Sequence, residues 1–457
     1  MKKGALIGIV CGIAVMVIAV IGAAAAVILN TPSARVVRGM TKLFAQSAEQ
    51  GEIFSDKLDF SKIQEISREG SYKNKIALNM DIEGLDDYSV SVDGTVLCDN
   101  INEKMREEIK ISLAYYELLS IQMAVDKNDV YIDIPALYEG SIVFDSRNIG
   151  EQYNHSIFAE YSDEKIADDL SLDFFEYTAY DTTGAAEELL ELIKNSEIKK
   201  ADSTVKAKVG NRETVCQGYT LRFKKEDVNH FLNILYEGME ESYEVKEDME
   251  LLVYMDRGNN VRQIETKNEF VTGDSINKVS AALRFAGEKN VLDMVKGKIG
   301  VEGNGDAVEI NFDYSGVKEG RSYNQTLQCK ASSELTDLFA IDYDAVWNLD
   351  EAAYDMDIEL NVADENYKVD VNGSVEADGY GFSMNFDDCE MYMNHEKLVD
   401  FDGSYSVEPL TEEISIPSGK TYPIFEFSQM EFYSFVMEVA QQLEDYYNIF
   451  DNFGNIF

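Results

Sequence analysis

Beyond residue 75, the chain alternates apolar and polar residues with a period of two. In YDMDIELNV, Met356, Ile358 and Leu360 alternate with acidic residues and an asparagine. This alternation is typical of a β-strand with one buried and one solvated face. Turn sequences such as VGNR (209–212), MDRGNN (255–260) and GNGD (303–306) separate these runs. Because short turns join successive strands, the sequence predicts antiparallel sheet built from hairpins.

Three segments have helical spacing instead: residues 184–198, 224–241 and 428–450. In the last, Ser428 and Glu431 have the spacing of a capping box. An apolar stripe follows them, and we expect it to pack on the sheet rather than bind a partner; it comprises Phe432, Phe435, Val436, Val439, Leu443 and Tyr446. The predicted fold is α+β, with large antiparallel sheets in one body or two lobes and a few packing helices.

Two stretches resemble each other, MDIEGLDDYSVSVDGTV (80–96) and MDIELNVADENYKVDVNGSV (356–375). Duplication and convergence of two alternating hairpins both remain open. The second contains the acidic series Asp355, Asp357 and Glu359, but Leu360 stands where a calcium-binding EF-hand loop needs glycine. In a strand these carboxylates line the solvated face, so we expect no metal site; calcium binding by dispersed carboxylates, with no residue assigned, stays open as the alternative.

No charged residue occurs from residue 4 to 29, a length sufficient for a helix to cross a hydrocarbon core of about 30 Å. We expect an uncleaved transmembrane signal anchor over residues 1–30. A cleaved signal peptide is the alternative, since Ala24 and Ala26 form an A-x-A pattern. Lys2 and Lys3 favour a cytoplasmic N-terminus, whereas the basic residues that follow the span, Arg35, Arg38 and Lys42, favour the opposite orientation. We expect the N-terminus inside and a large C-terminal domain outside the cell.

A chain of 457 residues exceeds what one hydrophobic core usually supports. We expect a membrane-proximal helical stalk over residues 31–75, with Val37, Thr41 and Phe44 at helical spacing. An antiparallel β lobe with helices is expected over 76–272. A second antiparallel lobe, over 273–457, is expected to end in the amphipathic helix.

Composition and motifs exclude several classes of function and partner. The chain has 40 Lys and Arg against 85 Asp and Glu, a net charge of −45, which argues against nucleic acid as a partner. No nucleophile, metal or nucleotide motif occurs, so we expect neither an enzyme nor a cofactor. Glycan hydrolysis stays open as an alternative, because it needs only two placed carboxylates.

Four cysteines lie outside the apolar segment: Cys98, Cys216, Cys329 and Cys389. An even number in an extracytoplasmic domain permits two disulfides. The economical pairing joins Cys98 with Cys216 and Cys329 with Cys389. The alternative is four separate buried thiols.

Three stretches carry a family resemblance: DVYIDIPALY (129–138), GYTLRFKKEDVNHFL (218–232) and VYMDRGNNVRQIE (253–265). They resemble membrane-anchored extracytoplasmic proteins of Firmicutes whose function is unknown and, more remotely, the LolA/LppX-like superfamily. That resemblance implies a curved half-barrel that closes around helices and can hold lipid. We therefore expect a non-enzymatic envelope protein that is attached to the membrane by one helix and binds a lipid or an envelope protein. An acidic structural component of the envelope is a further alternative.

Overall fold

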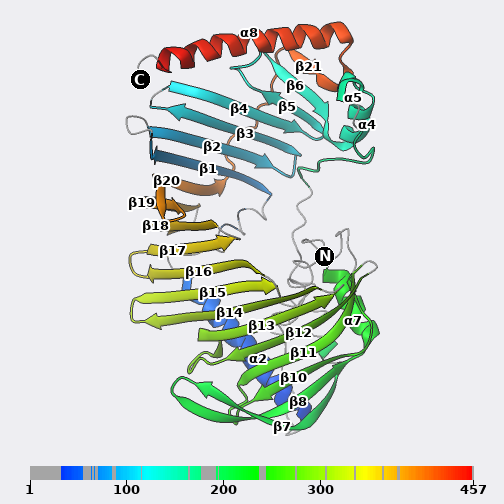
Figure 1. Ribbon diagram of the computed structural model, residues 1–457, viewed down its shortest axis with the longest axis vertical. Coiled ribbons are helices and arrows are strands. Elements are labelled where there is room, and N and C mark those ends of the chain that lie inside the picture. The colour runs from blue at the N-terminus through cyan, green and yellow to red at the C-terminus, as the bar shows by residue number, and fades with distance from the viewer. Residues whose placement is uncertain are drawn as a thin grey trace. The chain divides into compact units, whose positions relative to one another are not determined.

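The computed structural model describes residues 32–54, 63, 66, 70–84, 89–114, 116–162, 165–175, 192–193, 195–235, 243–272, 275–303, 306–333, 336–362, 365–377 and 381–454. The chain divides into two compact units. Unit 1 comprises Met1–Asp56, Tyr180–Val371 and Met391–Glu396, and unit 2 comprises Lys57–Ala179, Asn372–Glu390 and Lys397–Phe457. Strands dominate both units, and antiparallel pairing prevails, as the alternation predicted (Figure 1).

In unit 1, strand β8 pairs antiparallel with β7 on one side and with β10 on the other. From β10 to β17, each strand then pairs antiparallel with the next one in the chain. Short β9 pairs with β11. The strands are β7 (Glu197–Val209), β8 (Arg212–Phe223), β9 (Tyr243–Val245), β10 (Met249–Met255), β11 (Val261–Thr272), β12 (Ser275–Phe285), β13 (Met294–Gly303), β14 (Asp306–Glu319), β15 (Ser322–Ser333), β16 (Asp337–Asn348) and β17 (Ala353–Val362). The unit boundary falls inside β18 (Glu365–Ala377).

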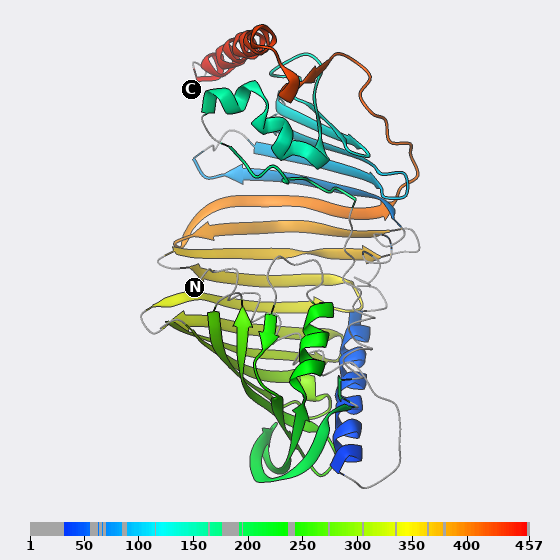
Figure 2. The ribbon, with the colours of Figure 1, turned by 90° about the vertical axis from the view of Figure 1, so that its right-hand side faces the viewer.

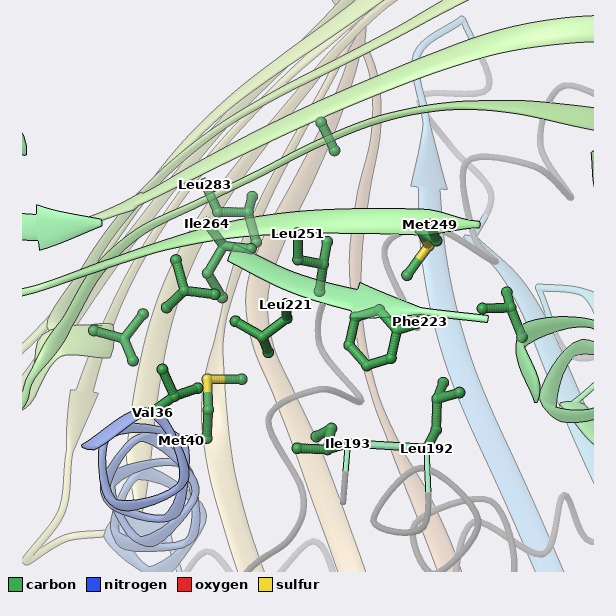
Figure 3. Packing of buried hydrophobic residues seen from close by; sticks show 14 of the residues in the cluster. Val36, Met40, Leu192, Ile193, Leu221, Phe223, Met249, Leu251, Ile264 and Leu283 are labelled. Atoms are coloured by element: carbon green, nitrogen blue, oxygen red, sulfur yellow. The ribbon is translucent and has the colours of Figure 1, made fainter. Parts of the chain in front are cut away.

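Two helices, α2 (Pro32–Gly51) and α7 (Lys225–Leu235), cover one face of this sheet (Figure 2). Figure 3 shows Val36 and Met40 of α2 facing apolar side chains of the strands, among them Leu221 and Leu251. Short 3-10 helices η1 (Glu52–Phe54) and η3 (Val291–Asp293) complete the unit. Residues 32–51 of the expected stalk form α2, whereas its last residues begin strand β1 (Ser71–Ile82). Val36, Met40 and Leu43 of α2 are buried in the core, one position before the residues singled out for their helical spacing.

In unit 2, strands β1 to β6 pair antiparallel in chain order. The strands of this unit are β1 (Ser71–Ile82), β2 (Ser89–Asp99), β3 (Lys104–Leu113), β4 (Tyr116–Asp126), β5 (Asp129–Asp133), β6 (Ser141–Asp145), β19 (Phe382–Met393), β20 (Glu396–Pro409) and β21 (Thr421–Pro423). On the other side of β1 lies β20, which also pairs with β19. Strand β21 pairs with β6 in parallel.

The pairing of β20 with β1 explains why the units differ from the predicted lobes, 76–272 and 273–457. The late strand β20 joins the first strand of the sheet, so residues from both ends of the chain share unit 2. Local sequence patterns carry no signal for such a distant pairing.

The helices of unit 2 whose bounds the structure describes are α4 (Ile149–Asn154), α5 (Ile157–Ser162) and α8 (Gln429–Gly454), with the 3-10 helices η2 (Ser146–Asn148) and η4 (Ile424–Glu426). The capping box of α8 is confirmed, since the Ser428 backbone N–H donates to Glu431 Oε2 at 2.9 Å. Phe432, Phe435 and Val439 pack on a cluster around Tyr138 and Tyr422. The remaining described stripe residues, Val436 and Leu443, are 41% and 46% exposed. The stripe is therefore only partly core.

Two other predicted segments fall largely outside the described residues. Of the helix expected over 184–198, Leu192 and Ile193 are helical and buried, but β7 already begins at Glu197. The apolar stretch from residue 4 to 29 lies entirely outside. Of the helices that the structure describes, none is both long enough and apolar enough to cross a membrane.

Candidate functional site

One face of the unit 2 sheet is apolar across β20, β1, β2, β3 and β4. Residues paired across a sheet point to the same side. Ile76 pairs with Tyr405 on β20 and with Gly94 on β2. Gly94 pairs with Ile109, and Ile109 with Ile121. Two further rows continue this face with Leu78, Val92, Ile111 and Leu119, and with Met80, Val90, Leu113 and Phe401.

These apolar side chains are not buried. Ile76 is 39% exposed, and the other apolar residues of the three rows are all partly exposed. In unit 1, by contrast, Ile264 and Leu251 are 1% exposed, because α2 and α7 pack on that face. We call the apolar surface formed by the three rows of β20 to β4 the open face. Gly94 adds no side chain to it, and Ile76 leans over the glycine, since a Cβ there would lie 2.7 Å from Ile76 Cγ2.

The opposite face of the same strands is polar. Lys75 forms an ion pair of 3.1 Å with Glu408, and Asn79 donates a hydrogen bond of 2.9 Å to Asp402. Lys110 lies 2.8 Å from Glu108. This face is solvated, so the apolar character is confined to one side of the sheet.

At one end the open face meets buried residues. Cys98 and Val125 are 2% and 0% exposed, and Val407, which pairs with Asn74 in the next row, is 1% exposed. The row between this end and Ile76 contains two polar residues, Asn74 on β1 and Glu107 on β3. The Oδ1 atom of Asn74 is buried and has no hydrogen-bond partner. The open face therefore has a polar group at the end where it becomes enclosed.

Unit 1 has a similar, smaller surface on β16 and β17. Ile341 pairs with Leu360 and Tyr343 with Ile358. All four side chains are partly exposed, and Val362 at the strand end is 41% exposed. Incomplete burial of apolar strand faces thus occurs in both units.

The four predicted cysteines lie on separate strands, and all are free thiols. Cys98 is on β2, Cys216 on β8, Cys329 on β15 and Cys389 on β19. Neither Cys98 with Cys216 nor Cys329 with Cys389 is joined in the structure. Cys98 stands opposite Tyr72, and Cys329 opposite Phe312. Burial raises the pKa of all four thiols.

The repeated MDIE hairpins have their acidic residues on the solvated side, as predicted. Asp81 and Asp357 are exposed, whereas Met80 and Met356 are partly buried. Within the described ranges, no group of three His, Cys, Asp or Glu side chains could hold a metal ion.

The pKa values of two neighbouring carboxyl groups, Asp357 and Asp370, are shifted in opposite directions. Burial and a hydrogen bond with Asp357 raise the pKa of Asp370, against the opposing effect of Lys368. The hydrogen bond from Asp370, followed by Lys368, lowers the pKa of Asp357. Lys368 Nζ lies 2.6 Å from Asp370 Oδ1 and 3.2 Å from Asp357 Oδ1.

No protein-family model and no curated protein matches the chain. Among solved structures, the low-pH structure of Pseudomonas putida OprB has a TM-score of 0.28 at 8% identity, covering 75% of this chain and 94% of that chain. Pseudomonas aeruginosa OpdQ has a TM-score of 0.27 at 7% identity, covering 74% and 98%. The P pilus usher PapC translocation pore has 0.21 at 7%, covering 71% and 57%. Such low TM-scores carry no argument about fold or function.

Sequence reasoning identified the alternating strands but not the residues of the open face on β3 and β4. A signal was present in KMREEIKISL, where Met105, Ile109 and Ile111 alternate regularly and Glu107 interrupts them. Glu107 stands at a position of the alternation that is otherwise apolar, so it predicts a charged group on the apolar face of the strand.

Proposed function

We propose that this chain is a non-enzymatic, membrane-anchored extracytoplasmic protein that holds a lipid or another hydrophobic ligand on the open face. The observation that carries the proposal is the partial exposure of apolar side chains aligned across five strands. Contiguous exposed apolar patches on folded proteins commonly mark binding surfaces. The curved sheet would act as a half-barrel of the LolA/LppX-like kind, with the apolar segment 4–29 as its anchor.

The chemistry of the open face suits an alkyl chain. Its residues are aliphatic or aromatic and present no hydrogen-bonding groups except the Tyr405 hydroxyl, whose pKa is raised by burial. Each methylene removed from water contributes about 0.8 kcal/mol. An acyl chain lying across several strands would thus gain enough to offset the ordering of the ligand.

A glycan-acting enzyme is the alternative, and the divergent acidity of Asp357 and Asp370 is the observation that favours it. Against it, Lys368 bridges the two carboxylates, and the Asp357 side chain is 55% exposed on a strand face. Catalytic carboxyls of that kind normally flank a bound sugar in a cleft. We therefore favour binding over catalysis.

The test is native mass spectrometry of the full chain purified from membranes, with identification of the lipid that remains bound. Leu78→Gln places an amide on the open face, whereas Asn79→Gln changes the adjacent residue on the polar face. We expect the first variant to retain about tenfold less lipid than the second, because an apolar contact is lost. Lipid held by the anchor is common to both variants. Equal lipid in both variants and the parent chain would overturn the proposal.

A further inference from the structure

Asn74 and Glu107 stand in one row of the sheet, on the side of the open face. Asn74 pairs with Val96, and Val96 with Glu107. The two side chains therefore emerge on the same side as Ile76, separated by Val96. Both are hydrogen-bond acceptors at the point where the apolar surface becomes enclosed.

Among the described residues, neither acceptor has a hydrogen-bond partner. Asn74 Oδ1 is buried without a hydrogen bond. Glu107 forms no ion pair or side-chain hydrogen bond with any residue in the described ranges. Glu108, its neighbour on the other face, pairs with Lys110 at 2.8 Å. Since buried polar groups are normally satisfied, the unpaired Asn74 Oδ1 points to a missing donor, and the partly exposed Glu107 carboxylate lies in the same row.

Charge further restricts what that donor can be. In the described rows of β1 to β4, the residues on this side include no lysine or arginine. The chain as a whole carries a net charge of −45. An anionic head group would meet a carboxylate without a compensating cation, whereas an ammonium or hydroxyl group would supply the missing donors.

We infer that the row of Asn74 and Glu107 selects amphiphiles whose head group donates hydrogen bonds and carries no negative charge, a primary ammonium above all. This inference rests on the proposed function and names its ligand class. The head group would lie at Asn74 and Glu107. The alkyl chain would extend toward Met80, a distance of about 20 Å at about 3.4 Å per strand residue.

The test is photo-crosslinking of the full chain in phosphatidylcholine vesicles. Three probes share one alkyl chain with a terminal diazirine and differ only in the head group, which is an ammonium, a hydroxyl or a sulfate. Adducts are located by peptide mass spectrometry. We expect adducts on β1 to β4, with a yield about tenfold higher for the ammonium than for the sulfate, as one charge-assisted hydrogen bond implies.

Two variants and two matched controls identify the recognising groups. Glu107→Gln should remove most of the preference for ammonium over hydroxyl, and Asn74→Leu should lower the yields of both donor probes. Glu108→Gln and Asn79→Leu alter the opposite face of the same strands and should change neither. Circular dichroism of each variant confirms that the sheet is retained.

The outcomes separate the two proposals. Equal yields from the three probes on β1 to β4 would overturn the head-group inference and leave the proposed function standing. An equal effect of Glu107→Gln and Glu108→Gln would also overturn it, because general charge would then explain the selectivity. Absence of adducts on these strands with every probe would overturn both.

Discussion

Arg262 donates a hydrogen bond of 3.0 Å from Nε to Asp256 Oδ2, and both side chains are buried in unit 1. Asp256 also accepts from the Asn260 backbone N–H at 3.0 Å, and Arg262 donates to the Gly287 carbonyl at 2.7 Å. The pair fixes the turn between β10 and β11, where MDRGNN predicted one.

Replacing Arg262 by methionine should lower the free energy of unfolding by about 3–5 kcal/mol, because the Asp256 carboxylate would stay buried without its cation. Urea denaturation measures the change. The control is Arg222→Met, which removes an ion pair of 2.9 Å with Asp248 whose arginine side chain is 53% exposed. For Arg222→Met, the free energy of unfolding should fall by less than about 1 kcal/mol. Similar losses in both variants would contradict the assigned role of burial.

The same pair predicts a pH dependence. Burial alone would raise the pKa of Asp256, but hydrogen bonds from Asn260 and Arg262, with the arginine charge, hold it below its ordinary value. A lowered pKa in the folded state stabilises the fold above the unfolded value of about 3.9. This contribution is lost as the pH falls through the folded-state pKa. Urea midpoints should thus fall more steeply below about pH 4 in the parent chain than in Asp256→Asn. Parallel slopes would contradict this.

Gly297 on β13 should not tolerate a side chain. A Cβ there would lie 2.0 Å from Cε1 of the Phe312 ring, and the glycine is buried. Gly297→Ala should therefore lower the free energy of unfolding by about 1–3 kcal/mol through overpacking. Gly300→Ala on the same strand would meet only the Ser280 hydroxyl at 2.9 Å, which can rotate away. Calorimetry should show a smaller loss for Gly300→Ala, and partial recovery when Phe312→Leu is added to Gly297→Ala.

Cys329 should be the first of the four thiols outside the apolar segment to react in the folded chain. It is partly exposed, whereas Cys98, Cys216 and Cys389 are buried. Because burial raises its pKa, labelling by N-ethylmaleimide should be slow at neutral pH and accelerate with rising pH. Peptide mapping without reductant measures the reaction and also tests the disulfide pairing. A linked peptide containing Cys329 and Cys389 would contradict this prediction.

Phe435 and Val436 are neighbours on α8 with different surroundings. The Phe435 ring centroid lies 5.0 Å from that of Tyr422 and 5.5 Å from that of Tyr138, whereas Val436 is 41% exposed. Phe435→Ala should destabilise unit 2 by more than about 1 kcal/mol but by less than the about 3–5 kcal/mol of a fully buried phenylalanine, because the side chain is partly exposed. Val436→Ala should change stability by at most about 0.5 kcal/mol. Limited proteolysis of the end of α8 provides the readout, and equal protection of both variants would refute the packing role.

Local patterns predicted the elements well where one face alone had to be buried. YDMDIELNV became β17, and the Ser428 and Glu431 spacing became the capping box of α8. In α2, the residues singled out for helical spacing begin at Val37, whereas the buried stripe begins at Val36. Since α2 has apolar residues on two adjacent faces, packing against the sheet determines which face is buried.

By itself, the sequence determined the strands, their turns and the solvated side of each strand, because the side-chain period of two is a property of the extended backbone. Only the tertiary structure decided that β20 joins β1, and that Asn74 and Glu107 share a row beside an apolar surface that remains partly exposed. The reason is physical: alternation within a strand fixes which of its faces is buried, whereas the pairing of strands far apart in the chain depends on contacts that no local pattern encodes.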